Sequence, residues 1–297
     1  MSAVFVTGAT GTVGSAVVGH LLARGESVVA AIRGPEDAAR VPAEASTRLF
    51  DFAASRAELR AALTGCDRLF LMRPPAIVDV RRFLFPLVDA ARDEGIQQIV
   101  FLSLQGVQVN RRTPHHAVES YLRALDAPYT LLRPNFFAQN LATAYAQRIR
   151  ESGEIFVPAG SSRTAFIDAR DIGRVAATAL TVEGHLQKAY TLSGEQSLTY
   201  EQVAAIMTDV LGRPIRYTRP SEQEYLAAMA AEGVPPDRLA VLKMIHRVVR
   251  LNISAFPNRT VRRLTGRAAT PLEEFVRDHA EAWTPATPPA HRNGPES

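Results

Sequence analysis

The sequence is poor in several residue types on which whole classes of protein depend. Cys66 is the only cysteine, which excludes an intrachain disulfide and a metal site built from cysteines, and we expect no metal. No apolar stretch is long enough to span a membrane, and the first predicted strand begins at Val4, which leaves no room for a signal peptide. We therefore expect a cytoplasmic protein without a membrane partner.

Lysine is also scarce, because only Lys188 and Lys243 occur and arginine carries the rest of the basic charge. The 34 basic side chains exceed the 30 acidic ones by only four, and they are spread along the chain without a long run. A nucleic-acid-binding protein favours a concentrated basic face. We therefore expect a small-molecule ligand and no nucleic acid.

The opening stretch VFVTGATGTVG places three glycines between an apolar strand at 4–6 and a helical pattern that begins at Val13. Gly8, Gly11 and Gly14 allow a tight turn, a close approach of backbone N–H groups to a pyrophosphate, and close packing of the helix on the strand. The pattern predicts a dinucleotide site. The alternative is a glycine-rich turn without a ligand, because Gly-x-x-Gly-x-x-Gly is not the commonest spacing.

Arg33 follows the second predicted strand, at 27–32, where a dinucleotide-binding protein selects its cofactor. An acidic residue at this place favours a free ribose hydroxyl, whereas arginine pairs with a 2′-phosphate. Arg33 therefore predicts NADP(H), and the alternative is a solvated charge at a strand end. Asp51 and Phe52, which close a third strand predicted at 48–52, are expected near the adenine.

Residues 1–134 alternate strand and helix patterns, which predicts an α/β fold with a doubly wound parallel Rossmann sheet and ligands outside the carboxyl ends of its strands. Residues 135–283 are less regular and predict a smaller C-terminal α+β cap, with some elements returning to the sheet. The Pro-rich residues 284–297 predict a disordered tail.

Two local patterns predict particular helix boundaries. Apolar residues from Val80 to Ala91 recur on one helical face, which predicts a single long helix that ends at Gly95. Asp171 precedes another helical pattern and is predicted to be its N-cap.

Four motifs in order along the chain resemble the NmrA-like group of atypical short-chain dehydrogenases. They are VTGATGTVG, APYTLLRPNFFAQN, AFIDARDIGRVAATAL and KAYTLSGEQSLTYEQVAAIMTDVLGRPIRY. This group includes NADPH-dependent quinone reductases and catalytically silent NADP(H)-sensing regulators, so the resemblance implies the fold and the cofactor but not the reaction.

The resemblance also implies which residues contact the cofactor. It implies that Arg33 meets the 2′-phosphate and that the pyrophosphate turn comprises Thr7, Gly8, Thr10, Gly11, Thr12, Val13 and Gly14. It places Met72, Arg73 and Pro74 along the ribose, and it places near the nicotinamide Ser103, Leu104, Pro134, Asn135 and Phe136.

The proton donor of ordinary short-chain dehydrogenases, a Tyr with a Lys four positions later, is absent, because Tyr121 is followed at that distance by Leu125. Related NmrA-like chains often carry a Lys four residues before the helix Glu, which is Glu119 here. That position is His115, with His116 beside it, and either imidazole is a candidate donor near neutral pH. The alternative is that both lie in a polar first turn without contacting substrate.

The missing donor pair favours an acceptor that needs little protonation. Reduction of an isolated ketone makes a strongly basic alkoxide, whereas a quinone or enone gives a delocalised anion, and a phenol has a pKa of about 10. We therefore expect an NADPH-dependent oxidoreductase acting on a planar quinone or conjugated carbonyl. A narrower hypothesis, based on the family and the Arg- and Ala-rich composition, is a polycyclic aromatic polyketide quinone.

Candidates for the substrate pocket follow from their types and positions, although such residues often belong to an ordinary core. They are Gln105, Phe137, Asn140, Tyr145 and His246. The alternative function is a non-catalytic NADP(H) sensor that signals through a protein. A downstream enzyme as partner, and a monomer or a homodimer, are both compatible with the sequence.

Overall fold

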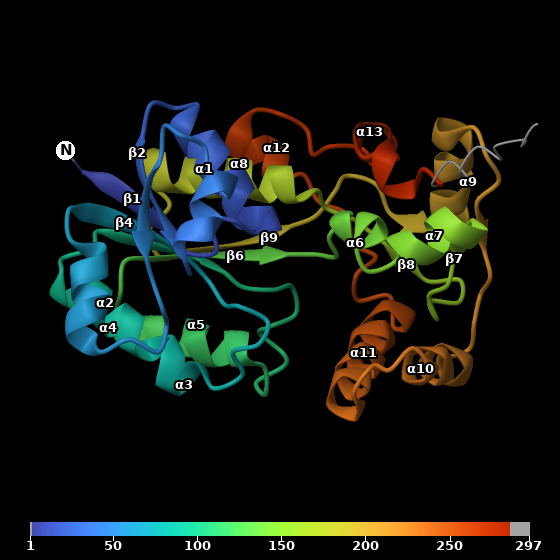
Figure 1. Ribbon diagram of the computed structural model, residues 1–297, viewed down its shortest axis with the longest axis horizontal. Coiled ribbons are helices and arrows are strands. Elements are labelled where there is room, and N and C mark those ends of the chain that lie inside the picture. The colour runs from blue at the N-terminus through green and yellow to red at the C-terminus, as the bar shows by residue number, and fades with distance from the viewer. Residues whose placement is uncertain (1, 286–297) are drawn as a thin grey trace, which may run out of the picture. The chain divides into compact units, whose positions relative to one another are not determined.

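The computed structural model describes residues 2–285, which form two compact units (Figure 1). The first unit comprises the chain up to Ala138, Arg163–Leu198 and Leu251–Pro271. The second comprises Gln139–Ser162, Thr199–Arg250 and the described residues from Leu272 onward. Most of the tail predicted at 284–297 lies outside the described residues.

A parallel seven-stranded sheet forms the centre of the first unit, as the sequence predicted. Every neighbouring pair of strands is parallel, and β1 lies between β2 and β4, so the chain order reverses beside β1. Ligands of such sheets bind outside the carboxyl ends of the strands at this reversal. Across the sheet the strands are β3 (Ser46–Leu49), β2 (Ser27–Ile32), β1 (Ala3–Val6), β4 (Cys66–Met72), β5 (Gln98–Leu102), β6 (Tyr129–Pro134) and β9 (Lys188–Leu192).

Two helical layers cover this sheet because alternate strand residues are apolar on both faces (Figure 1). Val4 and Val6 pack on one side with α1 (Thr12–Leu22), α8 (Ala169–Thr181) and α12 (Thr260–Thr265). Phe5 and Leu71 pack on the other side, which is covered by α2 (Arg56–Leu63), α3 (Val80–Phe83), α4 (Phe85–Asp93) and α5 (Pro114–Ala124). The doubly wound Rossmann fold is therefore confirmed.

The single helix predicted from Val80 to Ala91 is wrong, because the structure divides it at Leu84 into α3 and α4. Pro86 has no backbone N–H to donate one turn back, and proline is favoured only in the first turn of a helix. It lies in the first turn of α4, so a second helix begins there while the apolar face continues across the break.

The predicted cap of α8 is also wrong, because Asp168 and not Asp171 is the N-cap. The Asp168 carboxylate accepts a hydrogen bond of 2.8 Å from the backbone N–H of Arg170. Asp171 lies within the first turn, where it accepts a 2.6 Å hydrogen bond from the N–H of Thr270 and pairs with Arg174. The Asp171 carboxylate, which local spacing predicted to be the cap, is therefore used in a contact with a segment distant in sequence.

The second unit is mainly helical and contains one short strand pair, β7 (Glu154–Ile155) with β11 (Arg216–Tyr217). Its helices are α6 (Gln139–Ala142), α7 (Ala146–Ser152), α9 (Tyr200–Leu211), α10 (Glu222–Ala231), α11 (Pro236–Arg250), α13 (Leu272–Asp278) and the 3₁₀ turn η2 (Ala280–Trp283). Trp283 is buried, and its indole N–H donates to the carbonyl of Leu141 at 2.8 Å. A separate strand pair joins β8 (Arg163–Thr164) and β10 (Leu198–Thr199). Within residues 2–285, no helix has both the length and the apolar character needed to cross a bilayer.

Candidate active site

The turn after β1, which we expect to bind a pyrophosphate, is shaped by its three glycines. Gly8 has a φ of +63°, and a Cβ atom on it would lie 2.4 Å from the sulfur of Met72, so only glycine fits. A Cβ on Gly14 would lie 2.0 Å from the carbonyl oxygen of Gly8, which seats α1 directly against the turn. A Cβ on Gly11 would meet only that same oxygen, at 3.3 Å. The turn is therefore tightly packed against the protein at Gly8 and Gly14, whereas the space beside Gly11 is open.

Some residues around these glycines support the turn from inside the protein, and others lie at its surface. Thr7 is fully buried, and its hydroxyl donates to the carbonyl of Phe70 and accepts from the N–H of Met72, which ties β1 to β4. Val13 is buried beneath the turn, whereas Thr10 is half-buried and Thr12 is exposed at the start of α1. The first N–H groups of a helix have no partner within the helix, so they are available to an anion.

Arg33 lies just after β2 and is held by an acidic residue of the 3₁₀ turn η1 (Pro35–Arg40). The buried carboxylate of Asp37 lies 3.3 Å from Arg33 Nε and 3.2 Å from Arg40 Nη1. Arg40 Nη2 also donates to the carbonyl of Thr10 in the glycine turn at 2.8 Å. Hydrogen bonding from Arg33 lowers the pKa of Asp37, so this carboxylate stays ionised. Two guanidinium groups therefore flank the end of β2 beside the turn.

Arg40 belongs to this charged cluster beside the glycine turn, although the sequence analysis did not single it out. Its signal was available, because Arg33 stands four residues before Asp37 and Arg40 three residues after it, spacings at which opposite charges can pair. Both arginine side chains remain more than half exposed, at 81% and 57%, so each can still meet a ligand.

Asp51 and Phe52 lie beyond the third strand, which ends at Leu49 and not at Phe52 as predicted. Asp51 is exposed, and its carboxylate accepts from the N–H of Ala53 at 2.8 Å, which turns the chain away from the sheet. Phe52 packs edge-on against Phe50 with ring centres 4.8 Å apart.

A buried hydrogen-bonded ion pair joins the carboxyl ends of β5 and β6 to α5. Glu119, only 1% exposed, accepts from Arg133 Nε at 2.9 Å and from Arg133 Nη2 at 2.6 Å. The hydroxyl of Ser103 donates to the same carboxylate at 2.6 Å, and Arg123 lies 3.1 Å away. Burial alone would raise the pKa of Glu119, but these hydrogen bonds outweigh it and lower that pKa overall. Ser103 is therefore engaged as a donor within the protein.

The two candidate histidines stand at the start of α5, but they differ in their surroundings. Burial, together with the positive charge of Arg73, lowers the pKa of His115 to about 4, so this imidazole is neutral at pH 7. Within the described chain its ring nitrogens have no hydrogen-bond partner, and its ring centre lies 6.1 Å from that of Phe101. His116 places Nδ1 3.2 Å from the carbonyl of Val107, which holds the loop after β5.

Tyr121 is turned away from the strand ends. Its hydroxyl donates to Asp89 at 2.6 Å, and its ring stacks on Phe85 with centres 3.8 Å apart. Burial and this hydrogen bond to an anion raise its pKa to about 12. Tyr121 therefore cannot serve as the acid that the ordinary Tyr-x-x-x-Lys pair provides.

Arg73 follows β4, between the half-buried residues Met72 and Pro74. Its Nη1 donates to the carbonyl oxygens of Pro74, Pro75 and Ile77 at 3.0, 3.1 and 2.6 Å. Its Nε is buried without a partner in the described structure, and burial lowers the pKa of the guanidinium.

A segment distant in sequence, residues 251–256, packs on the residues that follow β5 and β6. Gln105 Nε2 donates to the carbonyl of Ile253 at 3.1 Å, and Asn135 Nδ2 donates to the carbonyl of Ser254 at 2.8 Å. Asn135 Oδ1 also accepts from the N–H of Phe136, so both the nitrogen and the oxygen of its amide are engaged within the protein. Sequence reasoning missed this segment, which has no local signal.

The remaining predicted residues divide between the two units. In the first unit, Leu104 and Phe137 are half-buried and Pro134 is buried. In the second unit, Tyr145 donates its N–H to the carbonyl of Asn140 at 3.0 Å, and burial raises the pKa of the Tyr145 hydroxyl. His246 is 1% exposed and packs on Tyr225, and burial lowers its pKa to about 4.

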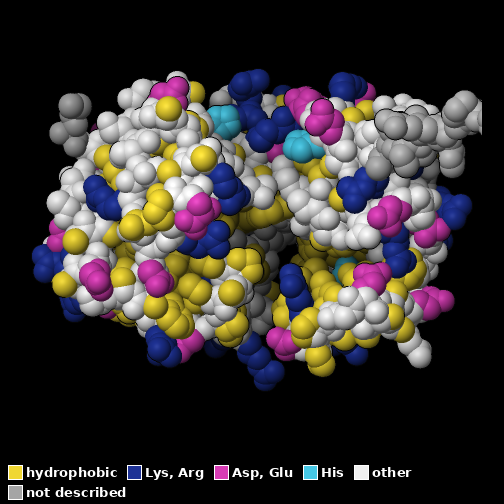
Figure 2. All heavy atoms as spheres, in the orientation of Figure 1, with side chains coloured by type: hydrophobic (Ala, Val, Ile, Leu, Met, Phe, Trp, Pro, Cys, Tyr) yellow, Lys and Arg dark blue, Asp and Glu magenta, His cyan; other side chains and the backbone are white. Residues whose placement is uncertain are grey.

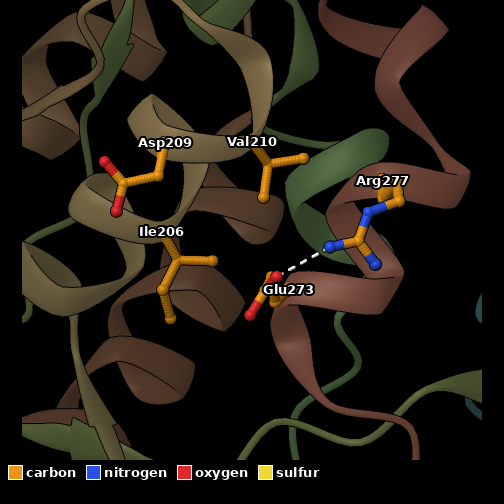
Figure 3. Close-up of a pocket in the computed structure, with 5 residues that line it drawn as sticks. All are labelled: Ile206, Asp209, Val210, Glu273 and Arg277. Carbon is orange, nitrogen blue, oxygen red and sulfur yellow. Dashed lines mark hydrogen bonds and ion pairs between the residues drawn. The ribbon is translucent and has the colours of Figure 1, made fainter.

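The second unit also contains a hollow of about 420 Å³ between α9 and α13 (Figure 3). Ile206, Asp209 and Val210 line one side, and Glu273 and Arg277 line the other. The two charged residues of α13 already pair with each other at 2.7 Å, and both are largely exposed. This hollow is a surface groove in which Glu273 and Arg277 pair with each other, and it contains none of the predicted site residues.

Figure 2 shows one face of the molecule, on which basic side chains are dispersed among acidic and hydrophobic ones over both units. No long basic stripe is present on this face. A contiguous positive surface, as nucleic-acid binding favours, is therefore not found there.

Comparison with known proteins places these features among reductases. A family model described as the NmrA-like family matches residues 1–256. An NAD(P)H azoreductase of Xenophilus azovorans is 33% identical and aligns over 94% of this chain and 99% of its own length. A (4-alkanoyl-5-oxo-2,5-dihydrofuran-3-yl)methyl phosphate reductase of Streptomyces griseus is also 33% identical, over 95% of this chain and 99% of its own.

Solved structures extend the likeness to the fold. An NADPH-dependent quinone oxidoreductase, QOR2 of Escherichia coli complexed with NADPH, is 26% identical with a TM-score of 0.83, over 93% of this chain and 99% of its own. The Citrobacter sp. triphenylmethane reductase complexed with NADP(H) is 26% identical with a TM-score of 0.82, over 93% of this chain and all of its own.

Proposed function

The chain belongs to the NmrA-like family, as its motifs predicted, and we propose that it is an NADPH-dependent reductase of flat conjugated acceptors, namely quinones or conjugated carbonyls. NADPH supplies a hydride when bound. The residues of the first unit would bind this cofactor, orient it and accommodate the charge that the acceptor gains.

The geometry of the first unit fits the cofactor. The turn at Gly11 is open to a pyrophosphate, because only the carbonyl of Gly8 lies near an added Cβ atom. Arg33 and Arg40, held by Asp37, supply positive charge just after β2, which supports recognition of a 2′-phosphate there. Two solved structures with similar folds are named as complexes with NADPH or NADP(H), which supports the same choice here.

The single observation that carries the choice of acceptor is that the candidate proton donors considered above are either engaged within the protein or uncharged. Ser103 donates to Glu119, Tyr121 donates to Asp89, and His115 is neutral at pH 7. None of these groups is a strong acid toward a substrate. An acceptor whose reduced form is a delocalised anion tolerates this, because water can protonate it afterwards.

The relatives' names support the same class of acceptor. One relative is named for azo groups, another for an unsaturated oxo-substituted furan, and the structural neighbours for quinones and triphenylmethane dyes. What these names share is an extended conjugated system. A polycyclic aromatic quinone, including one of polyketide origin, is a narrower candidate within this class.

The test is anaerobic NADPH oxidation by the purified protein with 1,4-naphthoquinone, a cyclic enone, an azo dye and cyclohexanone. We expect turnover with the conjugated acceptors and none with cyclohexanone. Equal rates with cyclohexanone would contradict the proposal, because a plain ketone needs a positioned acid. NADPH binding without turnover of any acceptor would instead favour the non-catalytic sensor.

A further inference from the structure

Arg73 differs from Arg33, Arg40 and Arg133, which also lie near the carboxyl edge of the sheet, in having no anionic partner. Arg133 pairs with Glu119, and Arg33 and Arg40 pair with Asp37. Within residues 2–285, no carboxylate pairs with Arg73, whose Nη1 is held only by three backbone carbonyls and whose buried Nε has no partner. A half-buried cation without a counter-ion is costly, so a group that binds there gains from being anionic.

The position of Arg73 follows from the strand that precedes it. Met72 packs beneath Gly8 on the α1 side of the sheet. The guanidinium of Arg73 reaches the carbonyl of Ile77, whose side chain packs with the cluster on the α2, α4 and α5 side. His115 lies on that same side, at the start of α5, and is close enough to feel the charge of Arg73. Arg73 and His115 therefore share one side of the sheet's carboxyl edge.

Of Arg73 and His115, only Arg73 carries a permanent positive charge. His115 stands at the start of α5, but its imidazole is neutral at pH 7. An arginine keeps its charge at every physiological pH, and its planar fork suits oxygen anions. The permanent positive charge on this side of the edge therefore comes from the end of β4.

We propose that Arg73 is a catalytic residue that stabilises the negative charge the acceptor gains when it receives hydride, an inference that rests on the proposed function. In this step the C4–H bond of the reduced nicotinamide breaks, and its electron pair and hydrogen pass together to the acceptor. The acceptor is reduced to a phenolate- or enolate-like anion, and the oxidised cofactor is the other product. Water then supplies the proton. A preorganised cation aimed at developing charge lowers the barrier of such a step.

The first experiment measures kcat and KM for 1,4-naphthoquinone at saturating NADPH in Arg73→Met and Arg73→Lys. We expect kcat to fall about 10- to 100-fold in Arg73→Met, and less in Arg73→Lys, which keeps the charge. NADPH affinity is expected to stay within about threefold of wild type. Arg112→Met, which removes an equally charged but exposed residue from the loop after β5, is the control and is expected to keep its kcat.

The second experiment does not depend on turnover, so it separates failure of this inference from failure of the proposed function. It compares binding of 2-hydroxy-1,4-naphthoquinone, an enolate at pH 7, with binding of neutral 1,4-naphthoquinone to the protein saturated with NADP⁺. Wild type and Arg73→Lys are expected to prefer the anion, and Arg73→Met is expected to lose that preference. Wild type that binds both rings equally would overturn the role of Arg73, whether or not NADPH is oxidised.

One further outcome would also overturn the inference. If Arg73→Met weakens NADPH binding but keeps wild-type kcat once NADPH is saturating, Arg73 contacts the cofactor and not the acceptor. If Arg73→Met does not fold, the result for Arg73→Lys decides the question. A role of the charge predicts that Arg73→Lys still prefers the anionic ring. A purely structural role of the guanidinium fork predicts that Arg73→Lys loses this preference.

Discussion

Asp37 forms an ion pair with Arg40, with Nη1 and Oδ1 3.2 Å apart, and this pair joins the end of β2 to the glycine turn. The same carboxylate holds Arg33, and the same guanidinium contacts the carbonyl of Thr10. Asp37 is almost fully buried, whereas both arginines are mostly exposed. The arrangement is therefore a fixed anion that orients two cations toward solvent, at the place where we propose that the 2′-phosphate of NADPH binds.

Replacing either arginine is expected to weaken NADPH binding selectively. Arg33→Gln and Arg40→Gln each remove one charge-assisted hydrogen bond to the 2′-phosphate, so we expect the Kd for NADPH to rise about tenfold or more. The Kd for NADH should change little, because NADH lacks that phosphate. Titration of each protein with both cofactors measures the ratio. Arg60→Gln, which removes an arginine paired with Glu94 on the helical layer, is the control, and an equal loss in that variant would contradict the assignment.

The glycine turn offers a matched pair of substitutions. In Gly14→Ala the new Cβ would lie 2.0 Å from the Gly8 carbonyl, so we expect a loss of stability of roughly 1–3 kcal/mol together with a loss of cofactor binding. In Gly11→Ala the contact is 3.3 Å and the φ is −91°, so we expect a nearly unchanged Tm and weakened NADPH binding. Thermal melts and cofactor titrations separate the two. A Gly11→Ala variant with full NADPH affinity would exclude this turn as the pyrophosphate site.

The buried Glu119 is expected to matter for stability. Glu119→Gln leaves Arg133 buried without its counter-ion, so we expect a loss of about 3–5 kcal/mol in the free energy of unfolding at pH 7. Glu94→Gln, at the exposed pair with Arg60, should cost only about 0–1 kcal/mol. Urea titrations of the two variants measure the difference. A cost for Glu119→Gln as small as that of the surface variant would refute this view of the ion pair.

The Glu119 carboxylate also determines in which direction the stability of the fold changes with pH. The folded pKa of Glu119 lies below the value in the unfolded chain, which is about 4.3. Its contribution is therefore fully present above about pH 4.3 and is lost as the pH falls through the lower, folded pKa. Wild type should lose stability in this acid range more steeply than Glu119→Gln. Equal slopes for the two proteins would mean that another carboxylate is responsible.

His115 is expected not to control the pH dependence of turnover. Its pKa of about 4 means that the imidazole is already neutral throughout the range from about pH 5.5 to 8. Profiles of kcat against pH for wild type and His115→Asn should therefore have the same shape across that range. An ionisation near pH 6.5 that disappears in His115→Asn would show instead that a protonated imidazole takes part.

The sheet and the glycine turn could be predicted because their signals are local. Buried parallel strands are continuous apolar runs, and Gly8 and Gly14 are required by contacts within a few residues and by the neighbouring strand. The division at Leu84 was also present in the sequence as Pro86, but an unbroken apolar face from Val80 to Ala91 concealed it.

The parts that sequence reasoning could not supply depend on distant partners. Asp171 was predicted as the cap from its local position, but its carboxylate contacts the distant Thr270 and Asp168 caps the helix. The 251–256 segment contacts Gln105 and Asn135, which lie more than a hundred residues earlier in the chain, so no local sequence pattern predicts this contact. Whether Arg73 has an anionic partner depends on where the fold places the carboxylates of distant residues, so its spacing in the sequence does not reveal it.

The most direct test of the central claim is the deuterium isotope effect on a single anaerobic turnover. Protein loaded with NADPH, or with NADPH carrying deuterium at the transferred C4 position, is mixed with 1,4-naphthoquinone, and loss of the reduced-nicotinamide absorbance is followed. Direct hydride transfer predicts rapid oxidation that is measurably slower with the deuterated cofactor. Full binding of NADPH without any oxidation by this or another conjugated acceptor would contradict the claim that the protein is a reductase.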